Sequence, residues 1–238
     1  MSFGAMGLPC HGKPAIAYTI AVDGVAAVVS EFGARERILP IRKNLEPHRL
    51  VIGKVMEAQI ILPMAFGHVA KSDKDVTRAL KRHHDAILDE LERLDGMAEV
   101  TLKGKWDVPN IFEYMLKQDP ELTAFRDRLY RGKHVPNHAE KIELGRHFEQ
   151  RLVQERQAHV QRVLDFVQEG ALDVSENPVK TEKMVMDLAF LVKSSEVKSF
   201  GERVQEVAKQ FPDEFSFAYN GPWAPFSFVQ LDLHAAMR

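Results

Sequence analysis

Histidine is the side chain most often used for proton transfer and metal binding near neutral pH, and this chain has ten histidines. Their spacing does not form a metal-binding motif. His83 and His84 are adjacent on a helical pattern, so they point about 100° apart and cannot share one ion as residues i and i+4 do. His134 and His138 have Pro136 between them, which disfavours a continuous helix. Solvated or partly packed histidines are the better interpretation, and we predict no metal site.

Motifs for covalent catalysis and for nucleotide binding are also missing from the sequence. Cys10 is the only cysteine; it precedes His11, but no third group orients the pair. There is no GxSxG sequence and no glycine-rich phosphate loop. Glu46, His48 and His68 form one further cluster, for which helix capping by Glu46 and a buried, hydrogen-bonded His48 are the alternatives to catalysis. We therefore predict no enzymatic activity, no catalytic or cofactor-binding residue and no cofactor.

Two hydrophobic motifs contain no acid, base or nucleophile but are unusual enough to suggest a contact surface. The first, ILPMAFG, spans residues 61–67, and the second, NGPWAPFSF, spans residues 220–228. The second combines two prolines, one tryptophan and two phenylalanines directly after a predicted strand. It is either a rigid turn whose aromatic rings close the end of a sheet or a preformed aromatic surface for a partner.

A third aromatic pattern raises the question of nucleic-acid binding. Phe215, Phe217 and Tyr219 alternate along one strand, as the base-stacking residues of RNA-recognition modules do. No basic residue flanks them, and the net charge of the whole chain is −2, whereas nucleic-acid-binding proteins usually carry a basic excess. We therefore interpret these rings as core residues and predict no nucleic-acid binding.

Length and composition describe an ordinary globular protein. With 238 residues, 45% hydrophobic and 28% charged, the chain is long enough for one large domain or two small ones without a metal or disulfide. The single cysteine fits a reducing compartment. No segment approaches 18 uninterrupted apolar residues, and the N-terminus lacks the pattern of a signal peptide. We therefore expect no membrane span and a cytoplasmic protein.

The first half of the chain is predicted to form a β-β-α-β-α-β unit. Alternating residues predict two strands over 15–32, joined by a turn at Asp23-Gly24. A helix capped by Asn44 follows to about residue 58. The alternation over residues 60–69 predicts a strand, and Pro63 within it indicates either an edge position or a strand with a break. An amphipathic helix over 72–94 and a half-buried strand over 98–106 complete the unit, with Glu99 on the wet face of that strand.

The second half is predicted to begin with helices and to end with a second sheet. One or two short helices over 108–136 precede a long helix over 137–169. Strands over 171–176 and 183–192 follow, then a helix over 195–210 and strands over 214–220 and 226–233. Residues 183–192 are apolar on both faces except at Asp187, which predicts a central strand.

At its two hydrophobic motifs, and over about residues 25–229, the sequence resembles the gas vesicle protein F/L family. Gly24 to Phe32 is similar to a family strand, Leu62, Pro63, Phe66 and Gly67 match a family LPxxFG motif, and Trp106-Asp107 matches a strand-ending pair. Residues 184–192 are similar to another family strand, although Asp187 stands where asparagine is usual. Residues 221–228 are similar to the family sequence GPWPPYSF, with Ala224 and Phe226 in place of proline and tyrosine.

The resemblance implies an α+β fold with two ferredoxin-like-variant α/β-sandwich domains, mainly antiparallel sheets and a helical segment between them. We place the N-terminal domain at residues 1–107, the helical connector at 108–170 and the C-terminal domain at 171–238. The implied function is non-enzymatic: a cytoplasmic, gas vesicle-associated accessory protein, a minor structural component or assembly factor. Its implied partners are the small hydrophobic shell protein and other accessory proteins, with the oligomeric state left open.

A small-ligand-binding regulatory module is the alternative, because ferredoxin-like domains often serve that purpose. A pocket with convergent polar groups would favour that alternative, whereas an exposed apolar patch or sheet edge would favour an assembly factor. The candidate partner-binding or family-motif residues are Leu62, Pro63, Phe66, Gly67, Trp106, Gly221, Pro222, Trp223, Pro225, Phe226 and Phe228.

Overall fold

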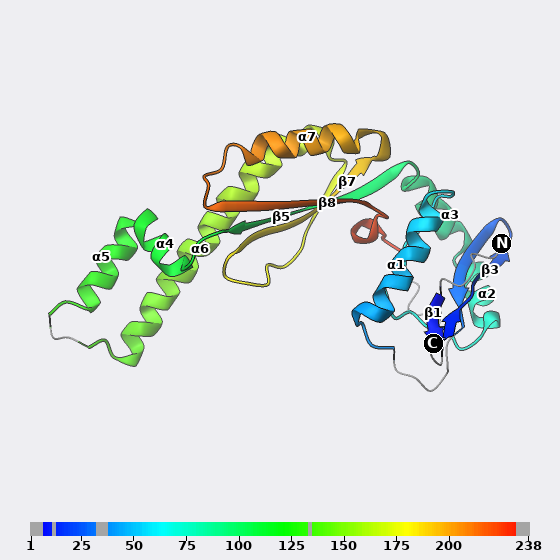
Figure 1. Cartoon of the computed structure of the whole chain (residues 1–238), viewed down its shortest axis with the longest axis horizontal. Helices are drawn as coiled ribbons and strands as arrows, with labels where there is room; N and C mark the ends of the chain where they lie inside the picture. Colours follow the sequence, from blue (N-terminus) through cyan, green and yellow to red (C-terminus); the bar gives the residue numbers. More distant parts are fainter. Residues whose placement is uncertain (1–6, 11–12, 32–37, 133–134, 232–238) are drawn as a thin grey trace. The chain divides into compact units, whose positions relative to one another are not determined.

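The computed structural model describes residues 7–10, 13–31, 38–132 and 135–231 and has an α+β fold (Figure 1). The chain divides into two compact units. The first comprises the described parts of residues 1–99 and 222–238, and the second comprises those of residues 100–221. The predicted boundaries at residues 107 and 170 do not coincide with these limits, because a strand that ends at Trp106 pairs with strands that follow much later in sequence.

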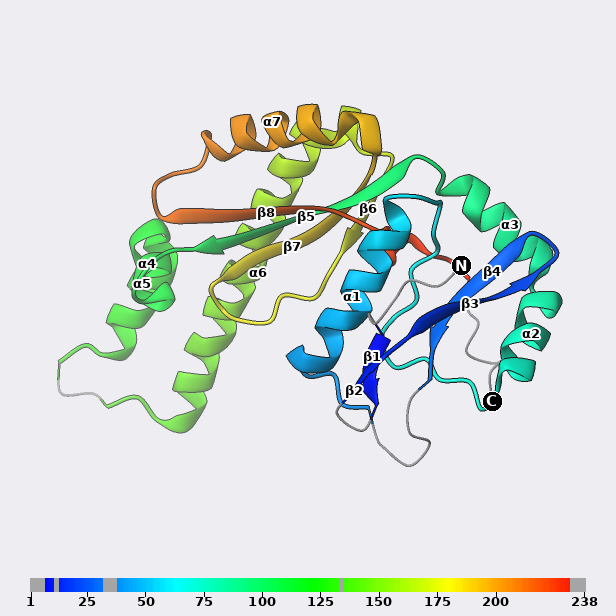
Figure 2. The same cartoon turned by 45° about the vertical axis from the view of Figure 1, so that its right-hand side comes forward.

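Two antiparallel pairs of strands begin the first unit (Figure 2). Strands β1 (Gly7–Cys10) and β2 (Lys13–Ala15) form one pair, and β3 (Ala17–Val22) and β4 (Val25–Ser30) form the other. The turn between β3 and β4 has positive φ angles at Asp23 (47°) and Gly24 (90°), as tight hairpin turns require. The predicted hairpin is confirmed.

Helix α1 (Arg42–Met56) starts before the predicted cap. The N-cap is Ile41, and Asn44 lies inside the first turn, so the prediction of Asn44 as the cap is wrong. The side-chain amide of Asn44 instead donates to the carbonyl of Leu39, 2.9 Å away. This bond fixes the chain just before the helix, which is how Asn44 stabilises the helix start without capping it.

The predicted helix over 72–94 is present as two helices, α2 (Asp73–Arg82) and α3 (His84–Arg93). The break falls at His83, whose φ and ψ of −110° and 18° lie outside the helical region. Ser72 caps α2 by accepting from the backbone N–H of Asp75, as its sequence position predicts. A core cluster in the described part of the first unit contains Val22, Val25, Leu80 and Ile87.

Residues 60–69 do not form the predicted strand. They connect α1 to α2 as an irregular segment in which Gly67 has a φ of 99°. Pro63 lacks the N–H that a ladder needs and is buried, so the apolar residues of this segment pack as a loop instead of pairing with a strand.

The second unit contains a four-stranded sheet in the order β6-β7-β5-β8 (Figure 2). Its strands are β5 (Met97–Trp106), β6 (Asp173–Glu176), β7 (Met184–Lys193) and β8 (Phe215–Trp223). Strand β7 lies inside the sheet, which confirms the prediction from its two apolar faces, and it pairs antiparallel with β6. Asp187, its one charged interior residue, is 3.0 Å from Nζ of Lys103.

Helices of the second unit pack on this sheet to form the larger core. The short helices are α4 (Ile111–Gln118) and α5 (Pro120–Leu129), separated at Asp119, and the long ones are α6 (His138–Val167) and α7 (Val197–Ala208). Short 3₁₀ helices are η1 (Gln168–Gly170), η2 (Ser194–Glu196) and η3 (Phe226–Phe228), the last in the first unit. With α6 and α7 as the helices between strands, the order of elements in this unit is β-α-β-β-α-β.

The predicted last strand over 226–233 is wrong for its described part. Residues 226–228 form η3, and residues 229–231 have no regular structure. Residues 232 and 233 lie outside the described part of the chain, as do His11 and His134. The segment is held by side-chain hydrogen bonds from other elements instead of a strand ladder.

Candidate functional site

The first hydrophobic motif is largely packed against the first unit. Leu62 is half-buried and contacts the core of that unit, and Pro63 is buried. Phe66 is half-buried, and Gly67 is exposed at its positive φ. Of the predicted site residues in this motif, Gly67 is therefore exposed, Leu62 and Phe66 each keep part of their surface accessible, and Pro63 offers no surface to a partner.

Two histidines hold this motif in place. His48 of α1 has its Nε2 atom 2.9 Å from the carbonyl oxygen of Met64, and its ring meets that of Phe66 edge-on at 5.6 Å. His68 has its Nδ1 atom 2.7 Å from the carbonyl oxygen of Ala65. These are the contacts of hydrogen-bonded structural histidines, the alternative to a catalytic role. Glu46 pairs with Arg42 at 2.6 Å, one turn earlier in the helix.

The second hydrophobic motif alternates between exposed and buried side chains. Trp223 is 38% exposed and Phe226 is 39% exposed, whereas Pro225 is buried and Phe228 is only 4% exposed. Gly221 and Pro222 at its start are exposed, and Gly221 has a φ of 131°. The buried residues anchor the segment, and the two exposed rings are available for a contact.

A cation lies over one of these rings. The guanidinium carbon of Arg49, in α1, is 4.7 Å from the centroid of the Trp223 ring, within the range of a cation–π interaction. Arg49 is exposed, and the next residue, Leu50, is 60% exposed. We call the exposed side chains Arg49, Trp223 and Phe226 the aromatic surface.

Two buried carboxylates hold the chain that follows Trp223. Glu99 of β5 accepts hydrogen bonds from the backbone N–H of Ser227 at 2.7 Å and from its hydroxyl at 3.1 Å. Glu90 of α3 accepts from the backbone N–H of Gln230 at 2.6 Å. Arg93 pairs with Glu90 through two hydrogen bonds and donates a third to the carbonyl of Phe228.

The environments of the two carboxylates shift their pKa values in opposite directions. Burial raises the pKa of Glu99, against the opposing effect of its bonds to Ser227. The hydrogen bond from Arg93 lowers the pKa of Glu90, and the Gln230 N–H adds to this effect. Sequence patterning missed Glu99: alternation placed it on the wet face, but it is 6% exposed.

Trp106 is not a surface residue. It ends β5 inside the core of the second unit and is 1% exposed. Its ring packs edge-on against Phe215, with centroids 5.9 Å apart. Phe217 and Tyr219 pack against the same core, in agreement with the core interpretation of the β8 aromatic residues.

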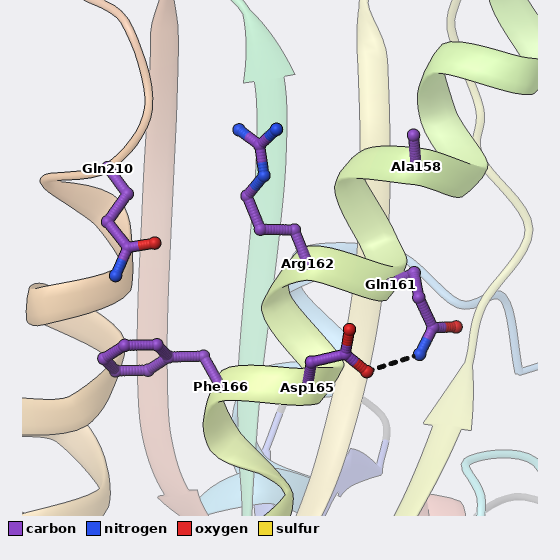
Figure 3. Close-up of a pocket in the computed structure, with 6 residues that line it drawn as sticks. All are labelled: Ala158, Gln161, Arg162, Asp165, Phe166 and Gln210. Carbon is purple, nitrogen blue, oxygen red and sulfur yellow. Dashed lines mark hydrogen bonds between the residues drawn. The ribbon is translucent and has the colours of Figure 1, made fainter.

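The second unit has a shallow depression of about 530 Å³ beside α6 and the end of α7 (Figure 3). Its polar groups do not converge on a common point. Gln161 donates to Asp165 at 2.6 Å, and Arg162 points away from Asp165, with its guanidinium 5.4 Å from the Phe211 ring. A second depression of about 380 Å³ lies along α5 and α6 and includes Arg151, which pairs with Asp119 and Glu155.

The described residues contain neither a metal-binding cluster nor a membrane-spanning helix. Over 7–10, 13–31, 38–132 and 135–231, no group of three or more histidine, cysteine, aspartate or glutamate side chains is placed to hold a metal ion. Within the same ranges no helix has both the length and the apolar character needed to span a bilayer.

Comparison with known proteins gives consistent matches over most of the chain. The family model described as gas vesicle synthesis protein GvpL/GvpF matches residues 9–230. Gas vesicle protein F of Microcystis aeruginosa is 31% identical over 213 residues, which is 88% of this chain and 86% of that protein. Gas vesicle protein F of Dolichospermum flosaquae is 30% identical over 214 residues, with 89% and 86% covered.

Solved structures match to a similar extent. The crystal structure of GvpF from Anabaena sp. PCC7120 superposes with a TM-score of 0.79 at 26% identity and covers 97% of this chain and 94% of that one. The crystal structure of GvpF from Microcystis aeruginosa gives a TM-score of 0.75 at 28% identity, with 92% and 90% covered.

Proposed function

The chain belongs to the gas vesicle synthesis protein GvpL/GvpF family, and from this premise we propose that it is a non-enzymatic accessory protein of gas vesicle assembly. It binds the small hydrophobic shell protein and other accessory proteins in the cytoplasm. One observation supports the proposed contact with the shell protein: the rings of Trp223 and Phe226 are exposed on a segment anchored by buried neighbours. Exposed aromatic side chains on a fixed backbone are typical of residues that dominate protein interfaces.

The proposed mechanism follows from the chemistry of the partner. A strongly hydrophobic shell subunit aggregates unless its apolar surface is covered before it enters the growing shell. Trp223 and Phe226 offer apolar area to such a subunit, and Arg49 keeps one edge of the aromatic surface charged. A contact of this size holds a subunit reversibly, because a few aromatic anchors give measurable affinity without the area of a permanent interface.

The test is co-purification of the tagged protein with the co-expressed shell protein. We expect the wild-type chain to keep the shell protein soluble and to capture it, and Trp223→Ala and Phe226→Ala each to reduce capture about tenfold or more. Phe166→Ala is the matched control, because Phe166 is also a phenylalanine on the surface and is 40% exposed, close to the 39% of Phe226.

Phe166 also lines the depression in the second unit, so the control tests the alternative function as well. If Phe166→Ala abolishes capture while Trp223→Ala and Phe226→Ala leave it unchanged, the aromatic surface is not the contact. The ligand-binding alternative receives less support from the structure, because Gln161 and Asp165 pair with each other and Arg162 points away from Asp165, so the polar groups of that depression do not converge.

A further inference from the structure

Residues 224–231, which we call the strap, cross the first unit without strand pairing of their own. The strap contains the 3₁₀ helix η3, and residues 229–231 have no regular structure. Such a segment has little backbone hydrogen bonding to hold it, so its conformation depends on side chains from other elements. Glu90, Arg93 and Glu99 supply these contacts.

The hydrogen bonds between these three side chains and the strap are few, but they involve charged or ionisable groups. Three of the hydrogen bonds to the strap join a charged or ionisable side chain to a backbone group: the N–H of Ser227, the carbonyl of Phe228 and the N–H of Gln230. Hydrogen bonds to charged groups contribute more than neutral ones, and removing one partner leaves the other unsatisfied. Glu90 and Glu99 are 8% and 6% exposed, so water does not readily replace them.

The held residues lie next to the exposed rings. Ser227 directly follows Phe226, and Phe228 is buried one residue later. Because Phe228 and Pro225 point inward, the backbone between them is fixed with the Phe226 side chain outward. Without the contacts, the strap would sample many conformations, so the exposed Phe226 ring would not keep a fixed place beside Trp223 at the end of β8. A partner would then have to order the segment on binding.

We infer that Glu90, Arg93 and Glu99 are positioning residues that hold the strap so that Trp223 and Phe226 are pre-organised for the partner. This inference rests on the proposed function. The three residues do not touch the partner themselves. They order the strap before binding, so its loss of conformational entropy does not weaken the binding step. Their substitution therefore weakens binding while the exposed rings remain chemically intact.

The experiment compares Glu99→Leu with Glu99→Gln in the full-length protein. Leucine fills similar space but cannot accept from Ser227. Glutamine keeps an oxygen for the Ser227 N–H, and its amide can donate to the Ser227 hydroxyl. Hydrogen exchange is measured by mass spectrometry for peptides that cover the strap and for a peptide within α2 (Asp73–Arg82), which lies in the same unit and is the reference for the stability of that unit. Capture of co-expressed shell protein is measured in parallel.

We expect Glu99→Leu to speed exchange in the strap about tenfold or more without changing exchange in α2, and to weaken capture by a similar factor. Glu99→Gln should restore both values to near those of the wild type. If Glu99→Leu also raises exchange in α2, Glu90→Gln serves as the milder variant, because it removes the charge that pairs with Arg93 and keeps an acceptor for Gln230.

Two results would overturn the inference. Unchanged strap exchange in both Glu99→Leu and Glu90→Gln means that these residues do not hold the strap. Faster strap exchange with unchanged capture means that the strap does not position the contact. Failure of the proposed function can be told apart from failure of this inference. If the aromatic surface is not the contact, Trp223→Ala itself leaves capture unchanged, whereas the effect of Glu99→Leu on strap exchange still tests whether Glu99 holds the strap.

Discussion

The imidazole of His159, on α6, lies edge-on against the ring of Phe215 on β8, with ring centroids 4.6 Å apart. Phe211 and Trp106 lie around the same imidazole, at 5.4 and 6.2 Å. The buried Nδ1 atom of His159 has no hydrogen-bond partner among the described residues. A neutral imidazole fits this enclosure, whereas a protonated one would lose hydration.

Stability should therefore fall in mild acid because of His159. Burial lowers its pKa, with Glu155 opposing this shift and Arg162 adding to it. The unfolded chain binds the proton more readily than the folded chain. The contribution of neutral His159 to the free energy of unfolding is therefore complete above about pH 6.5 and is lost as the pH falls through the folded-state pKa. Urea unfolding between pH 7.5 and 5 should show this loss, with a slope of at most about 1.4 kcal/mol per pH unit for one proton.

The control for this prediction is His159→Leu, which cannot titrate. Its free energy of unfolding should depend less on pH over that range than the wild type does. An equal pH dependence in the two proteins would show that other groups cause the acid loss. His84 offers a contrast, because its backbone bond to Asp23 raises its pKa, so its contribution has the opposite sign.

Arg156 should stabilise the loop that precedes β7. Its guanidinium donates to the carbonyls of Met184 at 2.9 Å, Glu182 at 2.8 Å and Thr181 at 3.1 Å. Arg156→Met keeps the apolar stem but leaves these carbonyls without the donor, which should cost about 1.5–3 kcal/mol in urea unfolding. A change below about 0.5 kcal/mol would mean that water replaces the guanidinium.

Gly104 should not tolerate a side chain. A Cβ atom there would lie 3.0 Å from Cγ of Met186 and 3.2 Å from Cε1 of Phe217. Gly104→Ala should therefore destabilise the second unit by about 1–3 kcal/mol in thermal or urea unfolding. Gly145→Ala is the matched control: Gly145 lies in α6 with nothing within 4 Å of the added Cβ, so the substitution should stabilise by about 0.5–1 kcal/mol.

Arg49 should order the Trp223 ring without contributing much to global stability. Arg49→Met keeps the stem and removes the charge, so we expect less than about 1 kcal/mol of destabilisation. The chain has two tryptophans, which give two indole N–H signals in an NMR spectrum. The Trp223 signal should shift and sharpen in Arg49→Met, whereas that of buried Trp106 should not. An unmoved Trp223 signal would contradict the cation–π contact.

Local sequence patterns are sufficient to predict those helices, strands and turns that depend on neighbouring residues. Asp23-Gly24 specifies the β3–β4 hairpin, because this pair adopts the positive φ angles that the turn needs. Asn137 starts α6 through a capping box with Glu140, and the apolar faces of residues 183–192 place β7 inside its sheet. Motif order over most of the chain was also enough to indicate the family that the comparisons show.

Features that depend on contacts with residues far away in the sequence could not be predicted and are seen in the tertiary fold alone. Residues 60–69 have the alternation of a strand, but a strand also requires an edge to pair with, and Pro63 is packed in a loop instead. Glu99 has the position of a solvent-facing residue, yet it is buried because Ser227, 128 residues later, supplies the donors that its carboxylate needs. Periodicity indicates which residues share a face, but it cannot indicate which distant groups will hydrogen-bond to a buried carboxylate. The conformation of the strap and of the aromatic surface depends on such hydrogen bonds between distant residues.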